Sequence, residues 1–268
     1  MHLPAYLARI GFTHAPRPDA ATLIAIHRAH LEAIPYENLD VQFGVASTID
    51  PGAAFEKLVT RRRGGWCYEM NGVLAAALDA IGFKVTRLAG AVMRETWGDA
   101  VIGNHLVLIV DLDEPWIADV GFGDGMVEPV PLAEGAFSQG VFDYRLEVLG
   151  DGWWRLHNHP EGGARSFDFN LAVRDEAFLI DRCRFLQTDP SSHMLQHTIV
   201  QGHRDNAMAM LVNRTLKRVS AAGVSKDIIP DADAYVRTLR EIFALDVPDA
   251  ASLWPRIVAR HEAILAAL

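Results

Sequence analysis

The chain has 268 residues and a formal net charge of -9, and 50% of its residues are hydrophobic while 22% are charged. This profile is typical of a globular protein with two lobes, or one lobe with extensions, and excludes a disordered or fibrous chain. The acidic balance argues against a nucleic-acid-binding protein, because phosphate contacts need a clustered basic face.

The length of the apolar runs and the surroundings of the cysteines indicate in which cellular compartment the protein lies. No apolar run approaches the roughly 20 residues that cross a bilayer, and Arg9 interrupts the N-terminal segment where a signal peptide would have an apolar core. The two cysteines, Cys67 and Cys183, lie in very different surroundings, which argues against a disulfide framework. We therefore expect a cytoplasmic protein that binds no membrane and whose thiols stay reduced.

The first part of the chain is predicted to be helical. Apolar residues recur at near-helical spacing over residues 20–33, and residues 53–62 form a second candidate helix. A third helix is expected to begin near Trp66 and to end at Gly82, so that Cys67 lies in its first turn.

From Lys84 onward the pattern changes to short β-rich runs, which predict an antiparallel sheet or a small barrel. Strands are expected over residues 85–93, 105–110, 116–120, 144–149, 153–157 and 166–169. A helix over 176–186 is then expected to cross back. It precedes strands over 196–201, 207–212 and 215–219 and helices over 233–245 and 253–268. The chain thus divides into helical, β and mixed sections, an α+β pattern without internal repeats.

The segment Arg63-Gly64-Gly65-Trp66-Cys67 indicates a nucleophilic thiol. The thiolate is the reactive form of cysteine, and the unpaired N–H groups at a helix N-terminus lower the pKa of a thiol. Gly64 and Gly65 would let the backbone approach a ligand closely. The alternative is a buried structural cysteine, which without the glycines would be the better interpretation.

His105 and Asp119 are the expected partners of this thiol. His105 opens the strand over 105–110, and Asp119 is expected within the next strand, after a hairpin connection at 112–115. Neighbouring antiparallel strands bring side chains on one face within reach, so the carboxylate could accept the imidazole N–H and fix its tautomer. Cysteine, histidine and acid would then form one relay. Without such a partner, His105 would be a core or edge residue and Asp119 a solvated edge residue.

Residues 121–125, Gly-Phe-Gly-Asp-Gly, follow the proposed aspartate directly. The exposed N–H groups of such a turn could receive a pyrophosphate or an oxyanion, although most turns of this composition are only turns.

Other residues suggest weaker hypotheses. His157 and His159 form an H-x-H pair, but no third ligand has suitable spacing and we expect no metal. A shared helix for His193 and His197 is doubtful after Pro190, and Cys183 is expected to be packed. We also propose that Arg63 pairs with Glu37, as a bidentate ion pair that braces the cysteine loop.

Together these motifs resemble the arylamine N-acetyltransferase family, in its bacterial type. The resemblance is carried by Arg-Gly-Gly-Trp-Cys at 63–67, by His105 opening a strand, and by Asp-Val-Gly-Phe-Gly at 119–123. Residues 34–40 resemble the family's Pro-Phe-Glu-Asn-Leu-Asp segment, with Tyr36 in place of phenylalanine, and residues 185–192 resemble another family segment.

The resemblance implies a three-section fold like that of cysteine proteases. Residues 1–84 would form a helical bundle that carries Cys67. Residues 85–190 would form an antiparallel β-barrel that carries His105 and Asp119, and residues 191–268 an α/β lid. Because the resemblance is to the bacterial type, we do not expect the insertion and C-terminal extension of vertebrate members. An open cleft that admits bulkier acceptors is therefore expected.

The resemblance also implies chemistry. Acetyl coenzyme A would acylate Cys67, coenzyme A would leave, and an arylamine, arylhydrazine or related amine would attack the thioester, without a metal. Cys67, His105 and Asp119 match the family's catalytic positions. The acceptor would contact Tyr36 and Phe122, and coenzyme A would contact Asn104 and Gly123. A homo-oligomer is compatible with this picture.

Other functions use the same three residues. Water could accept the acyl group, as in a cysteine peptidase or transglutaminase, or the chain could be an amide synthase that takes a polyketide acyl group. A catalytically silent binding protein is a third class. The sequence alone does not separate these alternatives.

Overall fold

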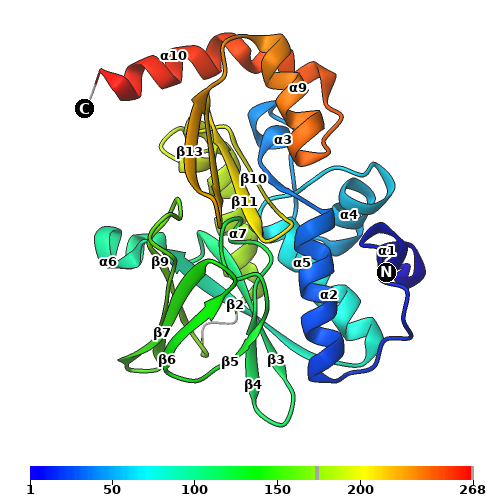
Figure 1. Ribbon diagram of the computed structural model, residues 1–268. Helices are drawn as coiled ribbons and strands as arrows, with labels where there is room; N and C mark the ends of the chain where they lie inside the picture. The colour runs from blue at the N-terminus through cyan, green and yellow to red at the C-terminus, as the bar shows by residue number, and fades with distance from the viewer. Residues whose placement is uncertain (173–174, 267–268) are drawn as a thin grey trace.

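The structure, a computed structural model, describes residues 1–172 and 175–266. Helices α1, α2, α4 and α5 lie beside a curved eight-stranded sheet, and a five-stranded sheet with α3 and α9 lies above both in the view of Figure 1. Of the helices formed by these residues, none is long and apolar enough to span a membrane. The predicted succession of helical, antiparallel-β and mixed sections is confirmed. Section boundaries at residues 84 and 190 stay predictions.

The N-terminal section is helical, as predicted. Its elements are α1 Leu3–Arg9, α2 Ala20–Ala33, α3 Leu39–Gln42, α4 Pro51–Phe55, a π-helical turn Glu56–Thr60 and α5 Cys67–Ile81. The Asp19 carboxylate accepts a hydrogen bond from Thr22 N at 2.8 Å and so caps α2. α5 ends at Gly82, whose φ of 109° favours glycine.

The helix predicted over 53–62 is confirmed with different bounds, since the chain is helical over 51–60 as α4 and the π-helical turn. α4 begins two residues earlier, because Asp50 accepts hydrogen bonds from the N–H groups of Gly52 and Ala53 and Pro51 suits the first helical position. The chain then continues as the π-helical turn. Neither α1 nor α3 was predicted.

The eight-stranded sheet is antiparallel throughout, in the order β5-β4-β3-β2-β9-β8-β7-β6. Its strands are β2 Lys84–Val92, β3 His105–Asp111, β4 Pro115–Ala118, β5 Val130–Pro131, β6 Gly135–Gln139, β7 Phe142–Gly150, β8 Trp153–His157 and β9 Ser166–Asn170. α6 Arg94–Trp97 and a 3-10 turn Gly98–Val101 connect β2 to β3. The sheet is an open half-barrel with edges at β5 and β6, which agrees with the expected antiparallel sheet or small barrel. The Gln139 side chain on β6 reaches the main chain of Val127 and Glu128, ahead of β5.

The five-stranded sheet combines one strand from the N-terminal helical section with four strands from the C-terminal section. β1 Tyr36–Glu37, from the helical section, pairs with β10 Ile199–Arg204. The remaining strands are β11 Ala207–Val212, β12 Thr215–Ser220 and β13 Gly223–Ile228. The helices around this sheet are α7 Glu176–Thr188, α8 His193–Gln196, α9 Ala232–Phe243, a 3-10 turn Pro248–Leu253 and α10 Trp254–Leu265.

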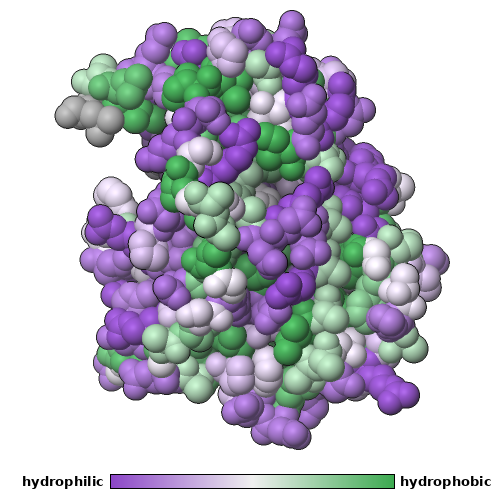
Figure 2. Space-filling model, in the orientation of Figure 1, coloured by the Kyte–Doolittle hydropathy of each residue, from purple (hydrophilic) through white to green (hydrophobic). Residues whose placement is uncertain are grey.

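The C-terminal helix agrees with its prediction as far as it is described. Residues 267–268 of the helix predicted over 253–268 lie outside the described residues. Hydrophobic residues are visible along α10 at the upper left of Figure 2, and Leu265 on this helix is exposed.

The doubt about a shared helix for His193 and His197 is confirmed, because α8 ends at Gln196 and His197 follows it with an extended backbone. Ser192 caps a short helical turn by accepting a hydrogen bond from Met194 N, and the His197 N–H donates to the carbonyl of His193. The two imidazole rings therefore lie 4.5 Å apart between centroids. This turn also explains why β10 begins at Ile199 and not at residue 196.

The core between α9 and the five-stranded sheet contains one unpaired hydroxyl. Tyr235 is fully buried with Leu239 and Phe243 against Val200 and Leu211. Its Oη has no hydrogen-bond partner among the described residues. Burial of a hydroxyl without a partner costs free energy, whereas the ring itself contributes apolar packing.

Tyr235→Phe is therefore expected to raise the free energy of unfolding by about 1 kcal/mol, because it removes an unpaired hydroxyl and keeps the ring. Tyr6→Phe is the matched control, since the Tyr6 hydroxyl bonds His30 Nδ1 at 2.9 Å in an equally buried position. It should lower the same quantity by about 1 kcal/mol. Urea denaturation measures both. Equal destabilisation by the two substitutions would contradict this account.

Candidate active site

Cys67 is the first residue of α5, as predicted, with Trp66 as the N-cap. The Trp66 N–H donates to Glu69 Oε2 at 3.2 Å, and the indole N–H of Trp66 donates to Ser47 Oγ at 3.1 Å. Lys57 donates to the same Glu69 oxygen at 2.8 Å. The helix end that carries the thiol is therefore fixed by buried polar contacts.

The glycine pair before Cys67 packs against protein. A Cβ on Gly64 would lie 2.2 Å from Pro35 O, and a Cβ on Gly65 would lie 2.9 Å from Leu58 Cδ1 and 3.0 Å from Glu69. The expectation that these glycines open a path for a ligand is wrong. They let the loop pack directly on β1 and on the first turn of α5.

The proposed pair of Arg63 and Glu37 is confirmed, although as part of a larger ionic cluster. Arg63 Nη2 lies 2.8 Å from Glu37 Oε1 and 3.0 Å from Asp40 Oδ1, so one nitrogen serves two carboxylates and the pair is not bidentate. Lys57 Nζ completes the cluster at 3.3 Å from Asp40 and 2.8 Å from Glu69. Although burial lowers it, the surrounding carboxylates raise the pKa of Lys57 above its ordinary value. The cluster braces the cysteine loop from behind.

His105 and Asp119 meet as predicted. His105 is the first residue of β3, and its Nε2 lies 2.6 Å from Asp119 Oδ2, with both side chains almost completely buried. The placement of Asp119 within a strand is wrong, because β4 ends at Ala118, which pairs with Leu108. Asp119 lies just past the last strand pair, where the chain turns toward α5.

The second carboxylate oxygen of Asp119 is also occupied. Oδ1 accepts hydrogen bonds from Asn71 Nδ2 and from Gly121 N, each at 2.8 Å. Burial raises the pKa of this carboxyl, but His105 and these donors outweigh burial and hold it below its ordinary value. Asp119 is therefore a buried carboxylate with donors on both oxygens.

Asn71 is a site residue that the sequence reasoning missed. Besides Asp119, its Nδ2 donates to Leu106 O at 2.6 Å, and its Oδ1 accepts from Val120 N at 3.0 Å. Asn71 comes four residues after Cys67 on α5, which puts both side chains on one helix face. A polar residue at that spacing from the nucleophile is the signal that could have found it.

The thiol of Cys67 lies against the main chain on both sides of His105. Its Sγ is 3.9 Å from the carbonyl oxygen of Asn104, which can accept a hydrogen bond from the S–H group but cannot donate one to a thiolate. Burial raises the pKa of this thiol, and the Leu106 N–H opposes the rise only in part. Burial thus opposes the lowering of this pKa that a helix N-terminus supplies, and an ionised sulfur in the resting protein stays a prediction. Among the described residues no hydrogen bond joins Cys67 to His105, whose Nδ1 is the ring nitrogen that Asp119 leaves free.

Phe122 and Tyr36 border the site with aromatic surface. The Phe122 ring centroid lies 5.7 Å from that of His105 and 4.9 Å from that of Phe167. Tyr36 is nearly buried, and its hydroxyl points at Met194 Sδ at 3.6 Å. Phe122 is therefore in contact with the proposed base, and the contacts of Phe122 and Tyr36 with an acceptor stay predictions.

The two residues expected to contact coenzyme A are engaged within the protein. The Asn104 amide bonds the main chain of Val92 in both directions, at 2.7 Å and 3.2 Å. Gly123 has a φ of +85°, and a Cβ there would overlap Gln201 Oε1 and lie 3.3 Å from Tyr36. Their contacts with coenzyme A stay predictions.

The glycine-rich turn after Asp119 packs closely as well. A Cβ on Gly121 would lie 2.8 Å from Cys67 Cα, and one on Gly125 would lie 2.9 Å from the Phe122 ring. The Gly121 N–H, which could have faced an anion, donates to Asp119. The turn therefore brings the aspartate segment against the start of α5.

His157 and His159 serve separate partners. His157 Nε2 bonds Glu147 Oε2 at 2.6 Å, and His159 Nε2 bonds the carbonyl oxygen of Asp124 at 3.1 Å. Within residues 1–172 and 175–266 no group of three or more His, Cys, Asp or Glu residues is arranged to hold a metal ion.

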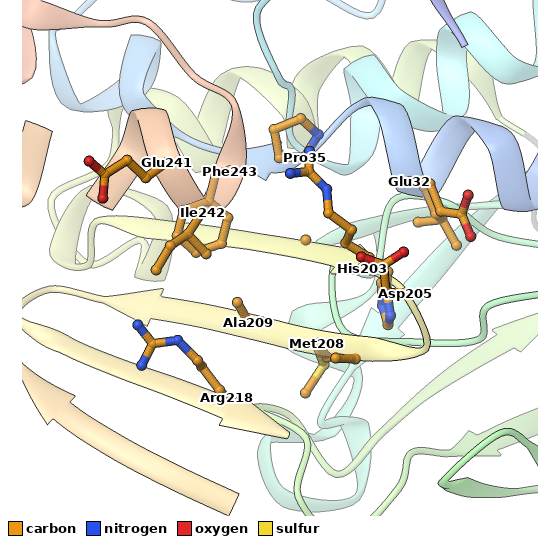
Figure 3. A pocket seen from close by; sticks show the side chains of 14 residues that line it. Glu32, Pro35, His203, Asp205, Met208, Ala209, Arg218, Glu241, Ile242 and Phe243 are labelled. Atoms are coloured by element: carbon orange, nitrogen blue, oxygen red, sulfur yellow. The ribbon is translucent and has the colours of Figure 1, made fainter. Parts of the chain in front are cut away.

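Two cavities lie apart from these catalytic candidates. One, of ≈ 320 Å³, is bordered by Pro35, Gly202 and Phe243, between α9 and the end of α2 (Figure 3). The other, of ≈ 550 Å³, is bordered by Ser47, Arg87 and Cys183.

Burial raises the pKa of Cys183 to about 12, and Gln187 Nε2 lies 3.3 Å from its sulfur. The expectation of a packed Cys183 is confirmed.

The chain is similar to known proteins over almost its whole length. Residues 19–252 match the N-acetyltransferase family model. The arylamine N-acetyltransferase of Mycolicibacterium smegmatis is 35% identical, with 94% of each chain covered. An arylamine N-acetyltransferase / N-hydroxyarylamine O-acetyltransferase of Salmonella typhimurium is 34% identical, over 92% of this chain and 90% of that protein.

Solved structures agree. The structure of Mycobacterium marinum arylamine N-acetyltransferase in complex with CoA has a TM-score of 0.86 to this chain at 31% identity, covering 96% of this chain and 97% of that one. The arylamine N-acetyltransferase from Salmonella typhimurium has a TM-score of 0.84 at 30% identity, covering 96% and 98%.

Gly121→Ala is expected to slow acetyl transfer from acetyl coenzyme A by about 100-fold, because the new methyl group would push the aspartate segment off the start of α5. Gly72→Ala is the matched control on α5. Its Cβ would meet only Ile49 O, at 4.0 Å, and its activity should stay near that of the wild type. Initial rates at a temperature where both variants are folded measure the effect. Equal activity of the two variants would contradict the close-approach role.

Proposed function

The chain belongs to the arylamine N-acetyltransferase family, as its motifs predicted, and from this membership we propose that Cys67 carries an acetyl group as a thioester, with His105 as its base and Asp119 behind the histidine. Acetyl coenzyme A is the donor, and arylamines, arylhydrazines or related amines are the acceptors. The likeness to the Mycobacterium marinum enzyme in complex with CoA supports this donor. The name of the Salmonella typhimurium relative supports arylamine acceptors.

The observation that carries this proposal is the buried hydrogen bond of 2.6 Å between His105 and Asp119, beside a cysteine at a helix N-terminus. A carboxylate that accepts the Nε2 proton fixes the tautomer in which Nδ1 has a free lone pair. Nδ1 is then available to take the proton of the Cys67 thiol. This proton transfer accompanies the attack on the donor, because the thiolate is the nucleophilic form of cysteine.

In the first half reaction, the sulfur of Cys67 forms a bond to the acetyl carbonyl carbon while its proton moves to His105 Nδ1. The bond from this carbon to the sulfur of coenzyme A then breaks, and the proton passes from Nδ1 to the leaving sulfur. In the second half reaction, the amine nitrogen attacks the thioester and gives a proton to Nδ1. Cys67 leaves and takes that proton back, which restores the resting enzyme.

Phe122 and Tyr36 are proposed to contact the acceptor, and Asn104 and Gly123 to contact coenzyme A. The support for Phe122 is its ring contact with His105. Gly123 lies between Tyr36 and Gln201, next to this aromatic surface. Because coenzyme A leaves before the amine binds, both substrates can use the same space beside Cys67 in turn.

The stepwise route predicts a burst of coenzyme A. Wild-type protein mixed with acetyl coenzyme A alone should release about one equivalent and then stop, and an added arylamine should start steady release. Cys67→Ala should give neither phase, whereas Cys183→Ala should keep both. Rapid-mixing detection of free coenzyme A thiol follows both phases. Continued release that does not depend on the amine would identify a hydrolase. Use of a carrier-bound acyl chain in place of acetyl coenzyme A would favour an amide synthase.

Asp119→Asn is expected to lower the rate of acetyl transfer by about 1,000-fold or more, because the amide can present a donor to Nε2 and stabilise the wrong tautomer. Asp111→Asn is the matched control at the exposed far end of β3 and should leave the rate unchanged. Single-turnover acetylation measures both. Wild-type turnover in Asp119→Asn would require another acid as the third member.

A further inference from the structure

His27 on α2 is a fully buried histidine that bridges to the site from a distant part of the sequence. Its Nε2 lies 3.1 Å from the main-chain nitrogen of Asp119, and its Nδ1 lies 3.0 Å from the carbonyl oxygen of Val127. The residues it joins are 92 and 100 positions further along the chain. No motif of the sequence analysis includes it.

These two contacts select one protonation state. The partner at Nε2 is a peptide N–H, which can only donate, so Nε2 must offer a lone pair. The partner at Nδ1 is a carbonyl oxygen, which can only accept, so Nδ1 must carry a proton. Only the neutral ring with its proton on Nδ1 satisfies both, because an imidazolium would put an N–H against the N–H of Asp119.

The surroundings of His27 favour this neutral ring. Burial lowers the pKa of His27 to about 4, against the smaller opposite influence of the hydrogen bond to Val127 and of the charges of Asp119 and Glu128. The other titratable groups whose charge couples to that of His27 are His30 on α2 and His203 on β10. At neutral pH the acceptor at Nε2 is therefore present.

The Asp119 N–H needs this acceptor because the strand ladder ends one residue earlier. Ala118 is the last residue of β4 and forms the last pair with β3. A buried main-chain N–H without a partner costs free energy comparable to a lost hydrogen bond. His27 supplies the missing acceptor at the residue whose side chain must stay aligned on His105.

We propose that His27 is a positioning residue for acetyl transfer, which holds the Asp119 peptide so that the carboxylate stays directed at His105 Nε2. This inference rests on the proposed function of the triad and extends it to a residue that touches neither substrate. Asn71 and Gly121 fix the carboxylate from one side, and His27 fixes the main chain from the other. Tilting of the Asp119 peptide would lengthen a hydrogen bond whose geometry decides the tautomer of His105.

The test uses His27→Asn and His27→Gln. Asparagine can bond Val127 O but is too short to reach Asp119 N, so the rate of Cys67 acetylation should fall about 10- to 100-fold. Glutamine reaches the position of Nε2 with an amide oxygen and should restore most of the rate.

His30→Asn is the matched control. His30 is equally buried on the same helix, three residues later, and bonds the Tyr6 hydroxyl instead of the aspartate segment. It should keep its rate within about threefold of the wild type even though it loses a buried histidine. An equal loss in both variants would overturn the proposal, because loss of helix packing would then explain it.

The pH dependence of Cys67 alkylation by iodoacetamide gives a readout that a purely structural role would not move. A displaced Asp119 stabilises the imidazolium of His105 less, so proton transfer from the thiol becomes harder. The midpoint in His27→Asn should therefore shift upward by about half a pH unit or more, and His30→Asn should not shift. Unshifted profiles with wild-type rates in folded His27→Asn would overturn the proposal.

A wild-type measurement covers the case in which His27→Asn does not fold. Nitrogen NMR of labelled histidines at neutral pH should show His27 protonated on Nδ1 and not on Nε2, and the opposite tautomer would overturn the proposal.

The variant Cys67→Ala distinguishes failure of the proposed triad from failure of the proposed role of His27. If that variant still transfers acetyl groups, the proposed function fails. If it is inactive while His27→Asn matches the wild type, only the role of His27 fails.

Discussion

The hydrogen bond between His105 Nε2 and Asp119 Oδ2 is the contact on which the site depends. A carboxylate so deeply buried is costly to keep ionised unless hydrogen-bond donors replace water. Asn71 and Gly121 supply these donors on the second oxygen. The pairing of β3 with β4 brings the two residues to one end of the strands, and α5 brings Asn71 and Cys67 to meet them. The fold thus places one ionised acid behind one imidazole, with the thiol in front.

This arrangement places the sulfur of Cys67 in buried surroundings. Burial and the Asn104 carbonyl favour the thiol, and no fixed cation faces it among the described residues. In the proposed mechanism His105 is the base, Asp119 leaves its Nδ1 free, and the thiol proton moves to Nδ1 as the sulfur attacks. Such coupling of proton transfer to attack suits an enzyme that must transfer its acyl group to an amine in the presence of water. The ionic cluster of Arg63, Lys57 and their carboxylate partners holds the cysteine loop in place while this happens.

The sequence alone was sufficient to predict features that are determined by residues close together in the chain. Cys67 follows two glycines and opens an apolar helix, and His105 and Asp119 flank short apolar strands, so their proximity follows from hairpin pairing. The sequence did not reveal residues whose role depends on contacts with residues far away in the chain. Asn71 and His27 act on Asp119 across 48 and 92 residues. The glycines were assigned to ligand contact because the protein atoms packed on them are invisible in the sequence. Strands β6 and β13 escaped prediction because they are largely exposed and lack the alternation of a half-buried strand.

The most direct test of the central claim is peptide mass mapping of wild-type protein after exposure to acetyl coenzyme A without an acceptor amine. The account predicts one acetyl group, carried by the peptide that contains Cys67, none on the peptide that contains Cys183, and loss of the label when an arylamine is added. An acetyl group on another residue, or a Cys67 peptide that stays unmodified while the protein transfers acetyl groups, would contradict it.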